Sequence, residues 1–267
     1  MSKGDNGMSK VICVCNQKGG TGKSTTVCNL GIGLARLGKK VLLIDGDSQG
    51  SLTASLGYKD PDSLDVSLAT IMEKLINYED LATEEGILHH QEGIDLMPAN
   101  IELAALEVSM VNVIGRERVL KNYIQLVKDQ YDFTIIDCNP SLGMITINAL
   151  ACADSVLIPV QSSYLPVKGL QQLIKTIGVV KRQLNEQLQI EGILLTMVDN
   201  RNSFSKDICE MVRNTYGDNV RIFKENIPRS VRAEETSAEG VSIFVHDKNG
   251  KVAKAYQALA EEVLANE

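Results

Sequence analysis

The densest group of chemically useful residues lies near the start of the chain, at positions 18–25, and reads Lys-Gly-Gly-Thr-Gly-Lys-Ser-Thr. Consecutive glycines allow backbone N–H groups to turn toward the β- and γ-phosphates of a nucleotide, and the start of a following helix adds donors and a favourable dipole. Lys23 is expected to neutralise phosphate charge, and the Ser24 hydroxyl to ligate Mg²⁺. The pattern predicts a phosphate loop whose nucleotide-binding residues are Lys18, Gly19, Gly20, Thr21, Gly22, Lys23, Ser24 and Thr25.

Two positions in this stretch depart from an ordinary phosphate loop. Gln17 stands where such a loop has glycine, and an ordinary loop does not need the lysine found at position 18. Lys18 cannot easily reach the phosphates of its own loop from the first position, whereas a facing subunit could insert it across an interface. We therefore expect a nucleotide-sandwich dimer in which Lys18 takes part in catalysis. The alternative is that Lys18 is only a solvated loop charge.

Three aspartates follow short apolar runs, where strands of a sheet would end. Asp45 and Asp47 follow the run 41–44, and Asp137 follows the run 133–136. Asp45 is expected to hold Mg²⁺ through its water shell and Asp137 to bind the outer shell of the ion. Asp47 is expected to be catalytic because it would orient or deprotonate the attacking water. A helix N-cap is the rival explanation for either Asp45 or Asp47. The predicted metal-binding residues are thus Ser24, Asp45 and Asp137.

The elements that would position these residues alternate between strands and helices. Helical spacing follows several apolar runs, for example over 24–37. Continuous apolar strands are typical of a sheet covered on both faces. We expect an α/β fold with a mostly parallel β-sheet flanked by helices on both faces, and ligands at the carboxyl ends of the strands. The predicted strands are 11–15, 41–44, 133–136, 155–160 and 190–196.

Two parts of the chain fall outside this pattern. Positions 1–9 are polar and contain glycine, so they are predicted to form a disordered N-terminal tail, with 10–267 as a single domain. The segment 57–97 is acidic and irregular, and we expect it to be a solvated excursion from the sheet. Its adjacent histidines, His89 and His90, are expected to be surface residues rather than a metal site.

The composition limits the class of protein. No run of 18 or more apolar residues occurs, so we expect a cytoplasmic protein that does not enter a membrane. A net charge of −7 argues against coating nucleic acid by bulk attraction, but it leaves room for a local basic patch. The six cysteines include no C-x-x-C pair and are expected to be core thiols in a reducing compartment.

Three segments, NQKGGTGKST, LLIDGDSQGSLT and IIDCNPSLGMITINALACAD, resemble the nucleotide motifs of the ParA/MinD family, which are P-loop NTPases of the deviant Walker A class. Three others, LIPVQSSYLPVKGL, GILLTMVDNR and IPRSVR, resemble its plasmid and chromosome partition branch, the short ParA/Soj type. The resemblance covers positions 10–264. It implies that ATP and Mg²⁺ are the cofactors and that ATP binding closes a homodimer with Lys18 in the partner's site.

The resemblance also implies partners. The ATP-bound dimer would bind non-specific double-stranded DNA and associate with the nucleoid, and a ParB-like centromere-binding protein would stimulate hydrolysis and release of the DNA. Because the first predicted strand begins near position 10, we expect no N-terminal helix-turn-helix domain.

Individual residues carry over from the resemblance. Met197 and Pro228 resemble positions that pack against adenine. The DNA-binding arginines correspond to Arg201, Arg229 and Arg232, and the segment 201–232 is locally basic. Two alternatives stay open: these arginines solvate loops, or Arg229 belongs to the nucleotide pocket. The family usually has proline at two positions next to the carboxylates, where this chain has Ser48 and Asn139, so both turns are expected to be looser than usual.

Rival functions make different demands on the sequence. A MinD-like positioning ATPase needs a basic amphipathic C-terminal helix, whereas here the end is acidic and its apolar residues form a packing stripe. An iron–sulfur carrier needs cysteines that bridge a dimer, and core packing accounts for those present. A nucleotide-gated DNA-binding module without turnover would not need a catalytic carboxylate. The packing stripe consists of Tyr256, Leu259 and Val263. The cysteines considered for an iron–sulfur cluster are Cys138 and Cys152. Asp47, together with Lys18, argues against a module without turnover.

Overall fold

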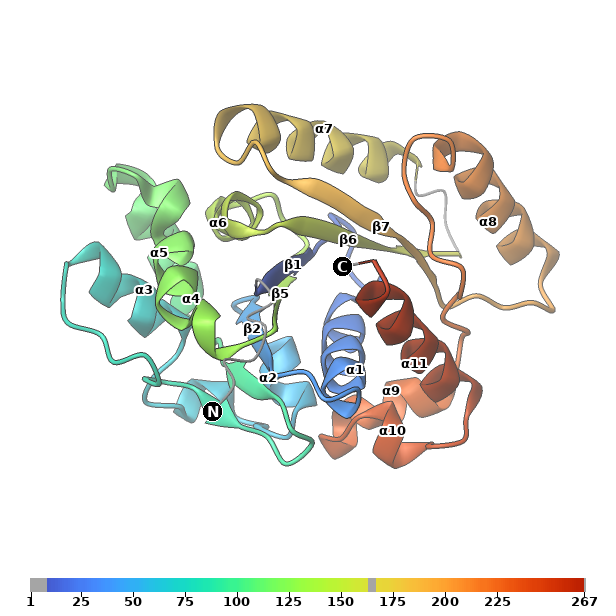
Figure 1. Ribbon diagram of the computed structural model, residues 1–267, viewed down its shortest axis with the longest axis horizontal. Helices are drawn as coiled ribbons and strands as arrows, with labels where there is room; N and C mark the ends of the chain where they lie inside the picture. Colours follow the sequence, from blue (N-terminus) through green and yellow to red (C-terminus); the bar gives the residue numbers. More distant parts are fainter. Residues whose placement is uncertain (1–8, 163–166, 267) are drawn as a thin grey trace, which may run out of the picture.

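The computed structural model describes residues 9–162 and 167–266, so the predicted tail at 1–9 lies outside the described residues except for Ser9. The described strands form one seven-stranded sheet with the order β3-β4-β2-β5-β1-β6-β7, and all neighbours are parallel except β3 and β4 (Figure 1). The mostly parallel α/β fold is therefore confirmed. The strands are β1 (Lys10–Val14), β2 (Val41–Gly46), β3 (Leu88–His89), β4 (Asp95–Met97), β5 (Phe133–Cys138), β6 (Ser155–Gln161) and β7 (Gln189–Thr196).

Helices cover both faces of this sheet, as the continuous apolar strands predict. The α-helices are α1 (Lys23–Arg36), α2 (Ser51–Ser55), α3 (Leu68–Ile76), α4 (Glu102–Ser109), α5 (Val119–Val127), α6 (Met144–Cys152), α7 (Val167–Gln183), α8 (Ser203–Tyr216), α9 (Val231–Glu239), α10 (Ile243–His246) and α11 (Lys251–Leu264). Short 3₁₀ turns are η1 (Pro61–Ser63), η2 (Met110–Asn112), η3 (Arg116–Arg118) and η4 (Lys128–Gln130).

Alternate residues of the central strands serve two separate hydrophobic cores. In β5, Ile135 joins the core shared with α1, α10 and α11, whereas Ile136 joins the core shared with α3, α5, α6 and α7. Because successive side chains of a strand point to opposite faces, each strand is buried on both sides. The carboxyl ends of β1, β2 and β5 are thereby held rigidly side by side.

The segment 57–97 is not a solvated excursion, and that expectation was wrong. Helix α3 begins after a capping box at Ser67 and buries Leu68, Ile71 and Met72 completely. Strand β4 then extends the sheet beside β2. The apolar residues of α3 have helical spacing, but the many acidic residues of this segment made that spacing hard to recognise in the sequence. His89 behaves as predicted for a surface residue, and its Nδ1 lies 2.6 Å from Asp95 Oδ1.

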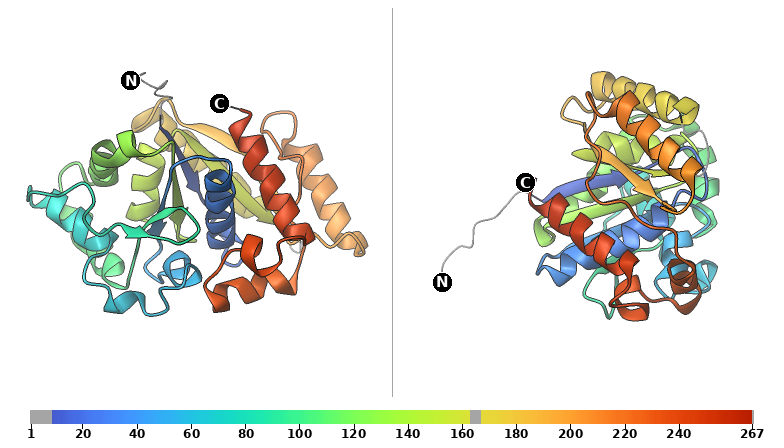
Figure 2. Two further views of the ribbon diagram at one scale, coloured as in Figure 1. Left: turned by 60° about the horizontal axis from the view of Figure 1, so that its bottom comes forward. Right: turned by 90° about the vertical axis from the view of Figure 1, so that its right-hand side faces the viewer.

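The C-terminal helix packs against the molecule along its apolar side. Tyr256, Leu259 and Val263 are buried in the same core as α1, which confirms the predicted packing stripe. Figure 2 shows α11, in red, lying along α1, in blue. Five of the six cysteines are also buried, as expected for core thiols. Within the part of the chain that the structure describes, no helix is both long and apolar enough to cross a bilayer.

Candidate nucleotide-binding site

The predicted phosphate loop connects β1 to α1 at the carboxyl edge of the sheet. Gly20 and Gly22 have φ values of 71° and 82°, a left-handed conformation that explains why glycine stands there. A Cβ added to Gly19 or Gly20 would meet no protein atom within 4 Å, so this side of the backbone is open to a ligand. Gly22 also caps α1 without a side-chain hydrogen bond, which leaves the first N–H groups of the helix available to an anion.

Polar side chains fix this loop to the neighbouring strands. The Asn16 amide nitrogen donates to the Pro159 carbonyl at 2.6 Å, and its oxygen accepts from the Lys18 N–H at 3.1 Å. The Thr196 hydroxyl donates to the Thr21 carbonyl at 2.9 Å. The loop is therefore held in place by the ends of β6 and β7.

The two lysines of the loop occupy different environments. The Lys23 side chain lies inside, with 7% of its surface exposed, and its Nζ donates to the Lys18 carbonyl at 3.4 Å. Lys18 is exposed at the surface. Lys23 is thus placed for phosphate within its own chain, while Lys18 is accessible to another subunit. Its role across an interface stays a prediction.

Asp45 is a fully buried carboxylate at the end of β2. Its Oδ2 accepts from the N–H and the hydroxyl of Thr53, at 2.8 and 2.7 Å, and its Oδ1 accepts from the Asp47 N–H at 3.1 Å. Burial raises the pKa of Asp45 from its ordinary value to about 6, although these hydrogen bonds act in the opposite direction. Asp45 therefore organises the turn that carries Asp47, in addition to its predicted role near Mg²⁺.

The predicted catalytic residue Asp47 is half-buried on the turn between β2 and α2. Its Oδ1 accepts from the Gln49 N–H at 3.0 Å, within the same turn. It does not cap α2, because the residue at that position is Gly50. The helix N-cap explanation for Asp47 is thus ruled out by its place in the chain.

The turn after Asp137 is braced by a side chain, although it lacks the usual proline. Asn139 Oδ1 accepts from the Ser141 N–H and hydroxyl at 3.1 and 2.9 Å, and from the Thr146 hydroxyl at 3.1 Å. These bonds restrain the turn where a proline ring would restrain φ. The expectation of a looser turn is therefore not supported at Asn139.

Asp137 is the clearest sign that a cation belongs in this site. It ends β5 between the phosphate loop strand and β2, opposite Val14 and Asp45 in the two ladders. Both carboxylate oxygens are buried, and neither has a hydrogen bond of good geometry among the described residues. Burial and the charge of Asp45 raise the pKa of Asp137 well above its usual range, while the nearby Ser24 hydroxyl and the charge of Lys23 favour its charged form. A buried carboxylate that is so poorly hydrogen-bonded is costly, and a cation would satisfy it.

The donor set fits Mg²⁺ bound together with phosphates. The described residues contain no group of three or more His, Cys, Asp or Glu side chains that could hold a metal alone. Mg²⁺ is usually held by one or two carboxylates plus the phosphates of its substrate, rather than by an all-protein cage. The predicted ligands Ser24, Asp45 and Asp137 meet this requirement.

A pocket of about 240 Å³, here called the nucleoside pocket, lies beside the phosphate loop. Its lining includes Gly22 and Thr25 from the loop and both predicted adenine contacts, Met197 and Pro228. Met197 has a φ of 52°, a left-handed conformation that is rare for a residue with a long side chain. The structure therefore brings the predicted base contacts to the phosphate loop, where a nucleoside would continue from its phosphates.

The three predicted DNA-binding arginines lie near the nucleoside pocket but in different settings. Arg201 is 93% exposed and its Nε lies 3.3 Å from Asp199 Oδ1. Arg232 is also exposed and pairs with Glu235 within α9. Arg229 is exposed as well, yet it lines the nucleoside pocket, as the second alternative for this residue required.

Several supporting residues escaped the sequence reasoning. Asn16 after β1, Thr53 in α2 and Thr196 at the end of β7 position the loop and the carboxylates, but a lone polar residue carries no signal of such a role. Glu107 in α4 accepts from the Ile145 N–H at 3.2 Å, next to the turn after β5. These contacts join separate helices, strands and loops, and they become visible only in the folded structure.

A phosphate loop, a buried carboxylate pair and an adjoining nucleoside pocket at the carboxyl edge of a parallel sheet define a P-loop ATPase. A family model described as an AAA domain matches residues 9–190. The chain belongs to the ParA/MinD-type family of P-loop ATPases, as its relatives show.

The chain is 42% identical to the sporulation initiation inhibitor protein Soj of Bacillus subtilis, over 97% of this chain and 100% of that protein. It is 40% identical to the chromosome partitioning protein ParA of Myxococcus xanthus, over 96% and 88% of the two chains. Among solved structures, cobyrinic acid a,c-diamide synthase from Mycobacterium smegmatis with bound ADP and magnesium is 36% identical, with a TM-score of 0.84 over 97% of this chain and 95% of that chain.

Proposed function

We propose that this protein is an ATP-dependent DNA segregation ATPase. ATP and Mg²⁺ bind at the phosphate loop, ATP binding closes a sandwich dimer, and the dimer binds double-stranded DNA without sequence preference. Hydrolysis, stimulated by a ParB-like centromere-binding protein, releases the DNA. The observation that supports this most is the contrast between the buried Lys23 and the exposed Lys18 in one complete phosphate loop.

The chemistry follows from the positions of the side chains. Ser24 would ligate Mg²⁺, and Asp45 and Asp137 would hold it through its water shell; when bound, the ion would supply neutralisation of phosphate charge. Lys23 would neutralise the phosphates from inside its own chain, and Asp47 would orient or deprotonate the attacking water. Lys18 of a second subunit would supply further positive charge to the transferred phosphoryl group. Turnover then depends on dimerisation, because one chain alone lacks this lysine in its own site.

DNA binding is assigned to the exposed arginines. Arg201 and Arg229 line one pocket beyond the end of β7, and Arg232 is exposed in the first turn of α9, on a protein that is acidic overall. A few cations on each half of a dimer would give weak, salt-sensitive and sequence-independent contacts with phosphates. Through these contacts the ATP-bound dimer, in the cytoplasm, would associate with the nucleoid.

Sedimentation with non-specific DNA in ATP, in ADP and without nucleotide tests the proposal. We expect the protein to sediment with DNA only in ATP, and less so as the salt concentration rises. Equal sedimentation in all three conditions, or none in ATP, would overturn it. Phosphate release by the protein alone, with no acid substrate or amide donor present, separates this function from the amide synthesis named for the Mycobacterium smegmatis protein.

A MinD-like positioning ATPase is the alternative, and it would bind a membrane rather than DNA. The apolar side of α11 is buried against α1 and is therefore not available to lipid. ATP-dependent sedimentation with anionic lipid vesicles, and not with DNA, would favour this alternative.

A further inference from the structure

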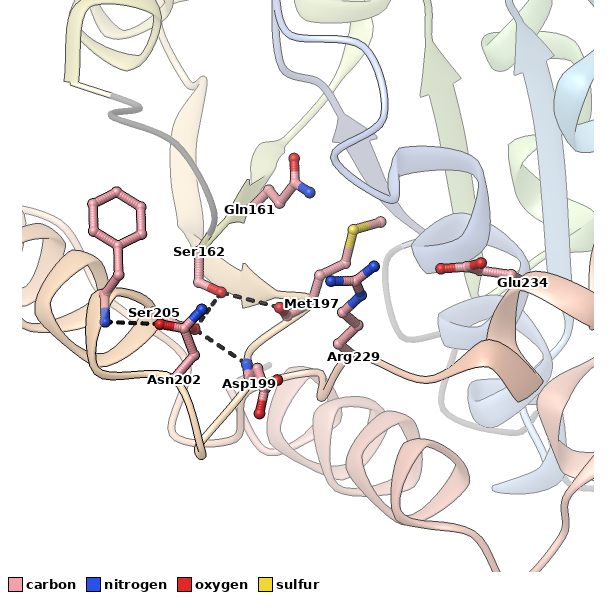
Figure 3. Close-up of a pocket in the computed structure, with 9 residues that line it drawn as sticks. Gln161, Ser162, Met197, Asp199, Asn202, Ser205, Arg229 and Glu234 are labelled. Atoms are coloured by element: carbon pink, nitrogen blue, oxygen red, sulfur yellow. Dashed lines mark hydrogen bonds between the residues drawn. The ribbon is translucent and has the colours of Figure 1, made fainter.

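Three adjoining pockets meet beyond the end of β7. The nucleoside pocket is the first. The serine pocket, about 430 Å³, is lined by Ser162 and Ser205 among others, and the basic pocket, about 510 Å³, is lined by Arg201 and Lys251 among others (Figure 3 shows the serine pocket). Within the described part of the chain, Arg229 is the residue that lines all three. One exposed, flexible side chain therefore borders both the predicted base site and the predicted polyanion site.

The backbones that carry the two sites are joined directly. The Val198 N–H donates to the Ile227 carbonyl at 3.0 Å, and the Arg229 N–H donates to the Val198 carbonyl at 3.1 Å. On these paired segments, Met197 and Pro228 line the nucleoside pocket and are each sequence neighbours of the bonded residues. The two predicted base contacts and Arg229 thus belong to one short, hydrogen-bonded unit.

A second set of bonds holds this unit from the side of the serine pocket. The Ser162 hydroxyl lies 3.0 Å from the Met197 carbonyl and 2.8 Å from the Ser205 hydroxyl. Ser205 in turn accepts from the Asp199 N–H at 3.1 Å. Figure 3 shows these bonds as dashed lines to the left of and below Met197. The backbone that carries Arg229 is therefore held by hydrogen bonds, while its side chain is exposed and borders the pockets.

Carboxylates flank the three pockets on both sides of Arg229. Glu234 of α9 lines the nucleoside and serine pockets, and Asp199 lines the serine and basic pockets. Asp199 already accepts hydrogen bonds from the backbone and side chain of Arg201. A planar guanidinium in this position is suited both to stacking on a base and to forked contact with phosphate.

We propose that Arg229 is a positioning residue shared by the nucleotide and the polyanion. A nucleoside in its pocket packs against the guanidinium, and this contact sets how far Arg229 reaches into the basic pocket. The two ligands are then coupled through one side chain, and each changes the affinity of the other by the same factor. The polyanion half of this inference rests on the proposed DNA binding, whereas the nucleotide half does not.

Calorimetry with ADP and no DNA tests the nucleotide half. Arg229→Gln is expected to weaken ADP binding about tenfold, because it removes a cation and a stacking surface from the pocket. Arg201→Gln is the matched variant, since Arg201 lines the basic pocket but not the nucleoside pocket. It should keep ADP affinity within about twofold of the wild-type value. Wild-type ADP affinity in Arg229→Gln, with thermal unfolding unchanged, would overturn the inference.

The coupling itself is measured as the ratio of affinities for a non-hydrolysable ATP analogue with and without a duplex of random sequence. In the wild type this ratio should differ clearly from one. Arg201→Gln should weaken DNA binding but keep the ratio, whereas Arg229→Gln should bring the ratio close to one. A ratio preserved in Arg229→Gln would refute the shared role. If the wild type binds no DNA in any nucleotide state, the proposed DNA binding fails, and the ADP measurement still decides whether Arg229 contacts the nucleotide.

Discussion

The phosphate end and the nucleoside end of the site are built in opposite ways. At the phosphate end, Lys23, Asp45 and Asp137 are buried, and adjacent parallel strands fix both aspartates. At the nucleoside end, Arg201 and Arg229 are exposed on connecting segments. Desolvated charges interact strongly and depend on exact placement, whereas exposed cations contribute weakly and additively. Substitutions at the phosphate end should therefore strongly lower ATP binding or the hydrolysis rate. Substitutions at the nucleoside end should lower binding affinity only modestly.

The largest effect on ATP binding is expected from Lys23→Ala. This removes the only loop cation that is buried beside the carboxylates of the described site, so ATP binding should fall by at least about 100-fold, which corresponds to ~2.7 kcal/mol. Calorimetry with Mg-ATP measures the loss. Unchanged affinity would show that the phosphates bind elsewhere, and Lys39→Ala, at the far end of α1, is the control with the same change of charge.

Asp47→Ala should separate turnover from binding. Loss of the residue that orients the attacking water should lower the hydrolysis rate by about 10²–10⁴-fold, with ATP affinity nearly unchanged and the dimer accumulating. Phosphate release and sedimentation velocity measure the two quantities. Normal turnover in this variant would remove Asp47 from the catalytic machinery.

Lys18→Ala tests whether the exposed lysine completes a neighbouring site. Both ATP-dependent dimerisation and turnover should be lost, because the transition-state charge would lack a contact worth roughly 10²-fold or more in rate. Mixing this variant with Asp47→Ala sharpens the test, since a mixed dimer carries one site that receives Lys18 and retains Asp47. Hydrolysing dimers formed by Lys18→Ala alone would contradict the role across an interface.

A smaller effect is expected at the nucleoside end. Arg201→Glu should weaken DNA binding by about tenfold at moderate salt and reduce the slope of affinity against salt concentration, while dimerisation persists. Lys128→Glu makes the same charge change at the opposite edge of the sheet and should have little effect. An equal loss in both variants would mean that net charge, and not this surface, governs binding.

A dependence of folding stability on pH is expected at the phosphate end. The folded-state pKa of Asp45, about 6, lies above its unfolded value, so the folded protein binds more protons between roughly pH 4 and 6. The free energy of unfolding of the nucleotide-free protein should therefore fall as the pH rises through this window. Asp45→Asn should flatten the curve measured by denaturant titration. A rise in stability over the same window would contradict the conclusion that burial of Asp45 outweighs its hydrogen bonds.

The difference between the two ends also decided what the sequence could predict. At the phosphate end, glycine spacing and strand-terminal aspartates report local backbone geometry, so the fold and the positions of Lys23, Asp45 and Asp137 were predictable. Asn16 acts through a contact with Pro159, and Thr53 accepts from the Ala99 N–H while it donates to Asp45; contacts with such distant residues as Pro159 and Ala99 are not encoded by a local pattern. Segment 57–97 was misjudged because its charges masked the buried positions of α3.

At the nucleoside end, prediction depended on resemblance, and it left Arg229 with two open assignments. The structure places this residue at both candidate surfaces, because residues 197–201 and 227–232 are bonded to each other across a long stretch of sequence. The sequence cannot reveal that one arginine serves both sites, because either role alone would account for an exposed arginine at this position.

The left-handed backbone of Met197 sets a conflict between stability and ligand binding. A non-glycine residue in this conformation costs about 1–2 kcal/mol, which glycine would avoid. Met197→Gly would relieve that strain but would also remove a wall of the nucleoside pocket. Folding stability and nucleotide binding therefore make opposite demands on this position. Glycine would favour stability, whereas the methionine found here favours the nucleotide site.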